Sequence, residues 1–231
     1  MRVKPWIGIL APPLLAGLSA SSFAAPVYLN YLNTTVTVGA NTTPGSWNNT
    51  ITAGGYASLD DALIKVIDAP SADATEVHSQ PSHIWYTTQS GGGLELNFTF
   101  DTEYDISTLH FWNYNGGDSY DVDWIDFAFY NASNLLQGTY SINPLPPGNS
   151  GAIEAQDFVL AAPLNVQYVT AFLGTTNGEI DFQNIGFTAE VSVPVDPDPD
   201  PTPVPAPGTF FLLAMSLIGL LVRTRGAGRA G

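Results

Sequence analysis

The residues best suited to hold a cation lie in an acidic segment that follows a Gly-Gly turn. The segment from Asp118 to Asp126 carries four carboxylates in nine residues. Calcium takes about six to eight oxygen ligands in a flexible geometry, so clustered aspartates in a loop suit it. Asp121 and Asp123 share one face of an extended chain, and Asp118 can reach back from the turn. We therefore consider Asp118, Asp121 and Asp123 candidate calcium ligands, with a solvated loop as the alternative.

Aromatic residues close to predicted strand ends suit a different ligand. Exposed Trp and Tyr rings stack on the apolar faces of sugars while neighbouring polar groups bond the hydroxyls. The candidates for such contacts are Trp47, Asn113, Tyr114, Asn115 and Tyr120. The alternative is that these aromatic side chains are ordinary residues at the rim of a sandwich.

The sequence offers no recognisable catalytic centre. It has no Gly-rich phosphate loop and no Gly-x-Ser-x-Gly elbow. The three histidines, His78, His83 and His110, lack the spacing of a zinc site, and the chain has no cysteine to complete one. Nothing selects a carboxylate pair for glycoside hydrolysis. We therefore expect a protein that is not an enzyme.

Charge is distributed very unevenly along the chain. All twenty-one acidic residues lie between Asp60 and Asp200, and Lys65 is the only basic residue in that part. Such a polyanionic surface repels nucleic acid and anionic lipid, so we expect neither as a partner, but it attracts divalent cations. Without cysteines the protein holds together without disulfides.

The two ends of the chain have the features of targeting segments. Arg2 and Lys4 precede an apolar region and a small-residue site at Ser22-Phe23-Ala24, which predicts a signal peptide over residues 1–24. Residues 194–207 are rich in Pro and Asp, which predicts an extended linker. Residues 208–231 contain an apolar stretch followed by arginines, which predicts a single hydrophobic helix. This helix is shorter than the hydrocarbon core of a membrane is thick.

This C-terminal layout resembles the PEP-CTERM sorting signal of Gram-negative bacteria. The residues that carry the resemblance are the motif Val204, Pro205, Ala206 and Pro207 and the arginines Arg223 and Arg225. The resemblance implies processing by exosortase, transient passage through the inner membrane on the C-terminal helix, and delivery to the cell surface or extracellular matrix. A simple C-terminal membrane anchor is the alternative.

Between these ends the hydrophobic pattern is mostly of period two. Leu94, Leu96, Phe98 and Phe100 alternate with polar residues, as in a strand with one buried face. Similar runs, separated by turn residues, are 27–32, 84–88, 106–114, 124–130, 135–142, 158–161, 166–173 and 180–193. This spacing predicts an all-β domain over 26–193, an antiparallel jelly-roll sandwich of about eight strands.

One segment has a helical pattern instead. Leu59, Ala62, Leu63 and Val66 recur at helical spacing behind Ser58, which predicts one short helix. The Asn- and Thr-rich stretch 33–52 is open to two interpretations, a hairpin or an irregular loop.

Residues 94–115 and 168–188 resemble discoidin or coagulation-factor type C modules, which are galactose-binding-like sandwiches. The segment Val66-Ile67-Asp68-Ala69 before Trp85 corresponds to an Ala-Ile-Asp-Gly segment before a Trp-containing strand in that family. The resemblance implies a calcium loop that includes Asp68, with Asp73 and Glu76 as further candidates.

Three functions are compatible with these patterns. The first is an exported, non-catalytic sandwich that binds exopolysaccharide or another glycan, with calcium as a candidate ion. The second is a structural matrix component whose acidic domains are cross-linked by divalent cations. The third is a secreted polysaccharide hydrolase.

Overall fold

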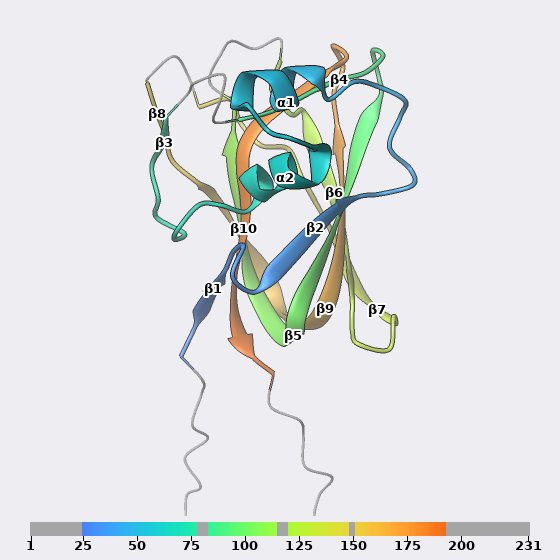
Figure 1. Cartoon of the computed structure of the whole chain (residues 1–231). Helices are drawn as coiled ribbons and strands as arrows, with labels where there is room; N and C mark the ends of the chain where they lie inside the picture. Colours follow the sequence, from blue (N-terminus) through green and yellow to red (C-terminus); the bar gives the residue numbers. More distant parts are fainter. Residues whose placement is uncertain (1–24, 78–82, 115–119, 148–150, 193–231) are drawn as a thin grey trace, which may run out of the picture. The chain divides into compact units, whose positions relative to one another are not determined.

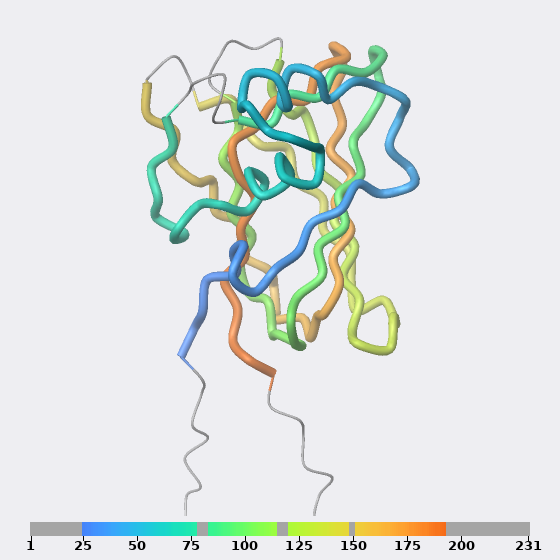
Figure 2. Tube along the Cα trace, viewed as in Figure 1, coloured from blue at the N-terminus to red at the C-terminus, as the bar shows by residue number. Residues whose placement is uncertain are grey.

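The computed structural model describes residues 25–77, 83–114, 120–147 and 151–192, and these form an antiparallel β-sandwich (Figures 1 and 2). The predicted signal peptide, the linker and the C-terminal helix with its sorting motif lie outside the described residues, as do Asn115 and Asp118. No helix within the described ranges is long and apolar enough to span a membrane.

Ten strands occur in the described part, where the sequence predicted about eight. Their bounds are β1 (Val27–Leu29), β2 (Thr34–Val38), β3 (Glu76–Val77), β4 (Ile84–Thr87), β5 (Gly93–Asn113), β6 (Trp124–Tyr130), β7 (Leu136–Ile142), β8 (Ala152–Ile153), β9 (Gln156–Gly174) and β10 (Glu179–Val191). Eight of them form one hydrogen-bonded sheet with a main path β1-β10-β5-β9-β6-β7, and every named strand pair is antiparallel. The prediction of an antiparallel sandwich is therefore confirmed.

Two long strands belong to both layers of the sandwich. The first half of β5 pairs with β2 and with the end of β9, and its second half pairs with β10 and with the start of β9. Register shifts between Thr99 and Tyr104 mark the point where β5 changes layer. The sequence runs 94–100 and 106–114 are thus one strand, and the runs 158–161 and 166–173 are likewise both in β9.

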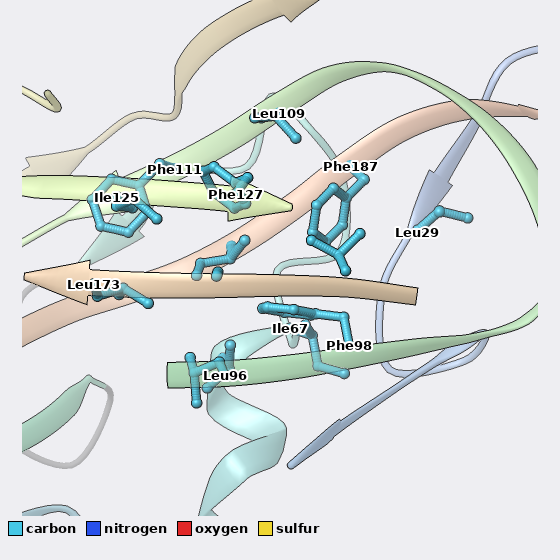
Figure 3. Close-up of a cluster of buried hydrophobic side chains, with 14 of the residues drawn as sticks. Leu29, Ile67, Leu96, Phe98, Leu109, Phe111, Ile125, Phe127, Leu173 and Phe187 are labelled. Carbon is cyan, nitrogen blue, oxygen red and sulfur yellow. The ribbon is translucent and has the colours of Figure 1, made fainter. Parts of the chain in front are cut away.

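The core lies between the two layers and is rich in aromatic rings (Figure 3). Phe98 and Phe187 come from opposite layers and meet edge to face, with ring centroids 5.3 Å apart. Such edge-to-face pairs add about 0.5–1.5 kcal/mol beyond the area they bury. Leu94, Leu96, Phe98 and Phe100 are all buried, so the alternation that predicted this strand also identified its inner face.

The predicted helix forms where expected. It consists of α2 (Leu59–Ala62) followed by the 3-10 turn η1 (Leu63–Val66). The Ser58 side chain accepts a hydrogen bond from the Asp61 backbone N–H, which caps the helix start. Leu63 and Val66 are buried against the main core.

A second short helix, α1 (Asn48–Gly54), corrects the prediction of only one. Asn, Thr and Gly have low helix propensity, so the sequence did not predict it. Tertiary contacts hold it instead, because the Thr50 hydroxyl bonds both the N–H and the C=O of Trp85 on β4, at 2.7 and 2.8 Å. The stretch 33–52, for which the sequence left a hairpin or an irregular loop open, contains β2, an irregular segment and the start of α1. Neither interpretation was complete.

Candidate functional site

The residues that form the most chemically distinctive site come from four segments far apart in sequence. They are His83 before β4, Trp85 in β4, Tyr114 after β5, Tyr120 and Asp121 before β6, and Asp181 in β10. We call this set the acid–aromatic site. The pairing of β4 with β10 places Trp85 directly opposite Asp181, so these two side chains stand on the same face of the sheet.

Two backbone contacts bring the segment before β6 to the same place. The N–H of Asp181 donates to the carbonyl of Tyr120 at 2.8 Å, and Asp121 forms an isolated parallel bridge with Asp181. Both carboxylate-bearing residues are buried, with Asp121 at 5% and Asp181 at 2% exposure. The site therefore holds two acidic side chains together away from water.

A chain of rings connects these acids to the surface. The His83 ring stacks on Trp85 with centroids 5.9 Å apart and contacts Tyr114 at 5.0 Å. Tyr114 in turn meets Tyr120 nearly edge to face at 6.3 Å. Tyr120 is 42% exposed, so the chain runs from the interior to a ring that solvent reaches.

No lysine or arginine among the described residues lies beside Asp181. Lys65 is the only lysine or arginine among the described residues, and its ammonium is bonded elsewhere, to Asp68. Burial, together with the charges of Glu179 and Asp121, raises the pKa of Asp181 to about 9. Burial and the nearby Asp181 also raise the pKa of Tyr114. The nearest imidazole nitrogen, on His83, is 3.9 Å from the Asp181 carboxylate, too far for a hydrogen bond.

Several buried polar atoms here have no hydrogen-bond partner among the described residues. They are Oδ1 of Asp181, Nε1 of Trp85, and both side-chain polar atoms of Gln183, which lies at the bulge of β10. Buried polar groups are nearly always bonded, because an unsatisfied one costs about 1–3 kcal/mol. The unsatisfied atoms are two N–H donors, on Trp85 and Gln183, and two oxygen atoms, on Asp181 and Gln183.

The predicted calcium ligands do not come together in the described residues. Asp121 is buried beside Asp181, whereas the carboxylate of Asp123 accepts from the backbone N–H of Thr176 at 2.6 Å. Asp68 lies in another cluster. Within the part of the chain that the structure describes, no group of three or more His, Cys, Asp or Glu side chains is arranged to hold a metal ion.

Two other residues predicted to contact a ligand, Asn113 and Trp47, instead bond or pack within the protein. Asn113 is fully buried, and its amide bonds the N–H and C=O of Val122 at 3.1 and 3.3 Å, which orients the segment before β6. Trp47 is half-buried against the main core, with its ring 4.8 Å from that of Tyr86. Of the predicted sugar contacts that are described, only Tyr114 and Tyr120 belong to the acid–aromatic site.

A second region holds partly buried carboxylates, and we call it the Lys65 cluster: Lys65, Asp68, Glu76 and Asn184. Lys65 forms an ion pair with Asp68. The Asn184 amide donates to Glu76 at 3.1 Å and accepts from the N–H of Ala69 at 2.9 Å. Burial and the charge of Asp68 raise the pKa of Glu76, and Lys65 opposes this rise.

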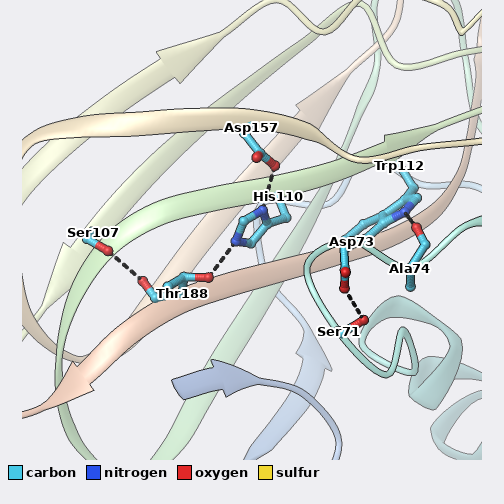
Figure 4. A network of polar contacts seen from close by, with 8 residues as sticks. All are labelled: Ser71, Asp73, Ala74, Ser107, His110, Trp112, Asp157 and Thr188. Atoms are coloured by element: carbon cyan, nitrogen blue, oxygen red, sulfur yellow. Dashed lines mark hydrogen bonds and ion pairs between the residues drawn. The ribbon is translucent and has the colours of Figure 1, made fainter. Parts of the chain in front are cut away.

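A third polar group lies across β5, β9 and β10 (Figure 4). The buried His110 ring contacts Asp157 through Nδ1 and the hydroxyl of Thr188 through Nε2, each at 2.7 Å. Ser107 donates to the carbonyl of Thr188 at 3.2 Å. Because Asp157 is a cross-strand partner of His110 in the sheet, this arrangement satisfies a buried imidazole between three strands.

Sequence reasoning missed His83, Trp85 and Asp181 as members of a site. The sequence patterns pointed to His83 only as a zinc candidate and to Trp85 only as part of the resemblance to the type C modules. The available signal was Asp181 itself, a charged residue between Ile180 and Phe182 in the predicted strand. Residues 180–187 are all buried, and burying a charged group costs free energy unless the group is paired, hydrogen-bonded or protonated.

No family model and no curated protein matches this chain. Among solved structures, it is similar to the F5/8 type C domain of a Bacteroides fragilis protein, with a TM-score of 0.48 and 11% identity over 72% of this chain and 98% of that one. It is also similar to the family 32 carbohydrate-binding module of C. perfringens NanJ in complex with galactose, with a TM-score of 0.43 and 7% identity over 71% and 99% of the two chains. The lectin domain of lectinolysin, complexed with Lewis B antigen, has a TM-score of 0.42 and 12% identity over 65% and 94%. The structural neighbours of this chain are thus discoidin-like domains of the F5/8 type C and family 32 carbohydrate-binding kinds.

Proposed function

We propose that the protein is a non-catalytic glycan-binding domain and that the sugar binds at the acid–aromatic site. The observation that carries the proposal is the set of unpartnered buried polar atoms beside a chain of rings that reaches the surface. A sugar supplies both complements, because its C–H face stacks on aromatic rings and its hydroxyls donate and accept.

The two ends of the site have separate tasks in this proposal. Tyr120 is the exposed ring on which a sugar face stacks, with Tyr114 set against its edge. Trp85 Nε1 donates to a hydroxyl oxygen, and Asp181 Oδ1 bonds a hydroxyl. With its pKa near 9, the Asp181 carboxyl is protonated at neutral pH and joins a neutral ligand at little electrostatic cost.

The test is a glycan array followed by calorimetry on the full chain and two matched variants. Tyr120→Ala removes the exposed ring of the site, and we expect about a tenfold loss of affinity, a common cost for a stacked ring at a binding centre. Tyr31→Ala removes a tyrosine of similar exposure, 48% against 42%, from the segment after β1. It should leave affinity unchanged. An array blank for every glycan, or equal losses in both variants, would refute the proposal.

We further propose that the domain works outside the inner membrane, delivered by the two end segments. The sequence patterns of residues 1–24 and 204–231 support this. Cells that make the chain without residues 204–231 should show an altered surface distribution by fractionation. An unchanged distribution would contradict the sorting role and leave the binding role intact.

A further inference from the structure

The loop 67–76 is the segment in which the resemblance to type C modules implies a calcium ion. Its candidate ligands are Asp68, Asp73 and Glu76. Calcium takes about six to eight oxygen ligands, commonly carboxylates together with backbone carbonyls. Among the described residues no group of three such side chains forms, and the exposed Asp73 carboxylate instead accepts from the Ser71 hydroxyl at 2.6 Å. Whether the loop fits the ion therefore depends on the oxygens that remain.

A positive charge of the chain itself already contacts Asp68. Lys65 stands three residues earlier, in η1, and its ammonium forms an ion pair with the Asp68 carboxylate. Both side chains are partly buried, so salt screens this pair less than a pair on the surface. A calcium ion on the same carboxylate would lie beside the ammonium, and like charges at such short range repel each other. Lys65 therefore excludes a metal ion from Asp68.

The second carboxylate, on Glu76, faces a hydrogen-bond donor. The buried Asn184 side chain accepts from the Ala69 N–H at 2.9 Å and donates to Glu76 at 3.1 Å. Because a backbone N–H only donates, the first bond fixes the amide oxygen toward Ala69 and turns the amide nitrogen toward Glu76. The amide nitrogen supplies partial positive charge to the carboxylate and offers no oxygen to a metal ion.

The backbone oxygens of the loop are also engaged. The carbonyl of Ala74 accepts from Trp112 Nε1 at 2.8 Å (Figure 4). The carbonyl of Ile67 accepts from the N–H of Tyr31 at 3.0 Å. The carbonyl of Ser71 accepts from the N–H of Ala74 at 3.2 Å. Direct bonds to β5 and to the segment after β1 thus hold the loop, which is the task that a structural ion performs elsewhere.

We propose that the Lys65 ammonium takes the place of a calcium ion in this loop, so that the domain folds without a metal. A single positive charge is enough, because it serves Asp68 while the Asn184 amide serves Glu76. The residues of the loop therefore do not fit the calcium ion that the resemblance implies. This inference is independent of what the domain binds.

The test measures thermal unfolding of the full chain with and without divalent cations. EDTA should move the wild-type midpoint by less than about 1 °C, whereas Lys65→Met, which removes the ammonium, should lower it by about 3–6 °C. Calcium at about 10 mM and constant ionic strength should raise the midpoint of the variant by about 3 °C more than that of the wild type, as expected for a site of roughly millimolar affinity. The wild type is the control for calcium that binds elsewhere on the acidic surface.

Two double variants locate this calcium response. Lys65→Met/Asp68→Asn lacks the carboxylate that the ion should bind, so its response should equal that of the wild type. Lys65→Met/Asp60→Asn makes the same charge change at an exposed residue of α2 and should keep the full response. Lys65→Gln, which is also neutral, repeats the comparison if Lys65→Met does not fold, and circular dichroism checks the fold of each variant.

Three results would overturn the inference. A wild-type midpoint that falls in EDTA and returns with calcium means that the domain holds a metal. A calcium response of Lys65→Met no larger than that of the wild type means that the ammonium does not stand in the place of a cation. A response that survives in Lys65→Met/Asp68→Asn places the ion away from this loop.

Discussion

The acid–aromatic site and the Lys65 cluster bury carboxylates in different ways. In the Lys65 cluster an ammonium meets Asp68, and the Asn184 amide bonds Glu76. In the acid–aromatic site no described lysine or arginine meets Asp181, whose Oδ1 has no hydrogen-bond partner among the described residues. In the first region the chain itself supplies an ammonium to Asp68 and an amide to Glu76. In the second region burial and the neighbouring acids raise the pKa of Asp181, so this carboxyl keeps its proton instead of gaining a cation.

The largest expected effect is a pH dependence of stability that originates at Asp181. The folded protein keeps a proton on this group up to about pH 9, whereas the unfolded chain releases it near the ordinary value of 3.8. Stability is therefore greatest at low pH and falls as pH rises toward 9. Between pH 7 and 9 the loss is about 2 kcal/mol, since each bound proton contributes about 1.4 kcal/mol per pH unit.

Urea unfolding at pH 7 and 9 checks this prediction with Asp181→Asn as the comparison. Asparagine resembles the protonated acid and does not titrate, so the variant should lose less stability over this range. If the free energy of unfolding falls equally in the wild type and the variant, Asp181 is already ionised at pH 7. The contrast between the two regions then fails.

A smaller effect is expected when the cation is removed from the Lys65 cluster. Lys65→Met leaves Asp68 without its ammonium partner, and both side chains are partly buried, at 16% and 26% exposure. We expect a loss of about 1–2 kcal/mol, between the values for exposed and fully buried pairs. The double variant Lys65→Met/Asp68→Asn should recover part of that loss in urea unfolding. A double variant no better than the single one would show that Lys65 acts through packing alone.

The smallest expected effect tests the contribution of one neighbour to the acid–aromatic site. Glu179 is the first charged group that raises the pKa of Asp181. Glu179→Gln should lower the pKa of Asp181 in the folded protein by less than about one unit, so the fall in stability ends at a lower pH and the total loss is smaller by less than about 1.4 kcal/mol. The measurement is the same pH series of unfolding curves. A shift to higher pH would have the wrong sign for repulsion between the two acids.

The sandwich could be predicted because apolar and polar residues alternate within each single strand, and this local pattern can be recognised in the sequence. Leu94 to Phe100 shows it clearly, and the strand forms with the expected buried face. It did not predict that 94–100 and 106–114 are one strand, since a bend between layers leaves no local pattern. It also missed α1, where Thr50 is held by the backbone of β4 some 35 residues away.

The site was partly predictable for the same reason. Tyr114 and Tyr120 were predicted because an aromatic residue next to a turn can be recognised from the local sequence alone. Asp181 and Trp85 become a pair only through the register of β4 against β10, and no local spacing encodes that register. Asn113 looked like a ligand contact because it neighbours Tyr114, but its amide is used by the backbone of Val122.

The strand β10 connects the acid–aromatic site with the far end of the domain. It begins beside Asp181, and its last residues pair with β1, where Val27 lies opposite Ala189. Thirteen residues of extended chain cover about 43 Å. A force between a bound ligand and the C-terminal end of β10 acts along this strand, and its ladder hydrogen bonds lie across the direction of pull. The force therefore loads these hydrogen bonds together in shear. Many of them would have to break at once before β10 could be pulled out of the sheet.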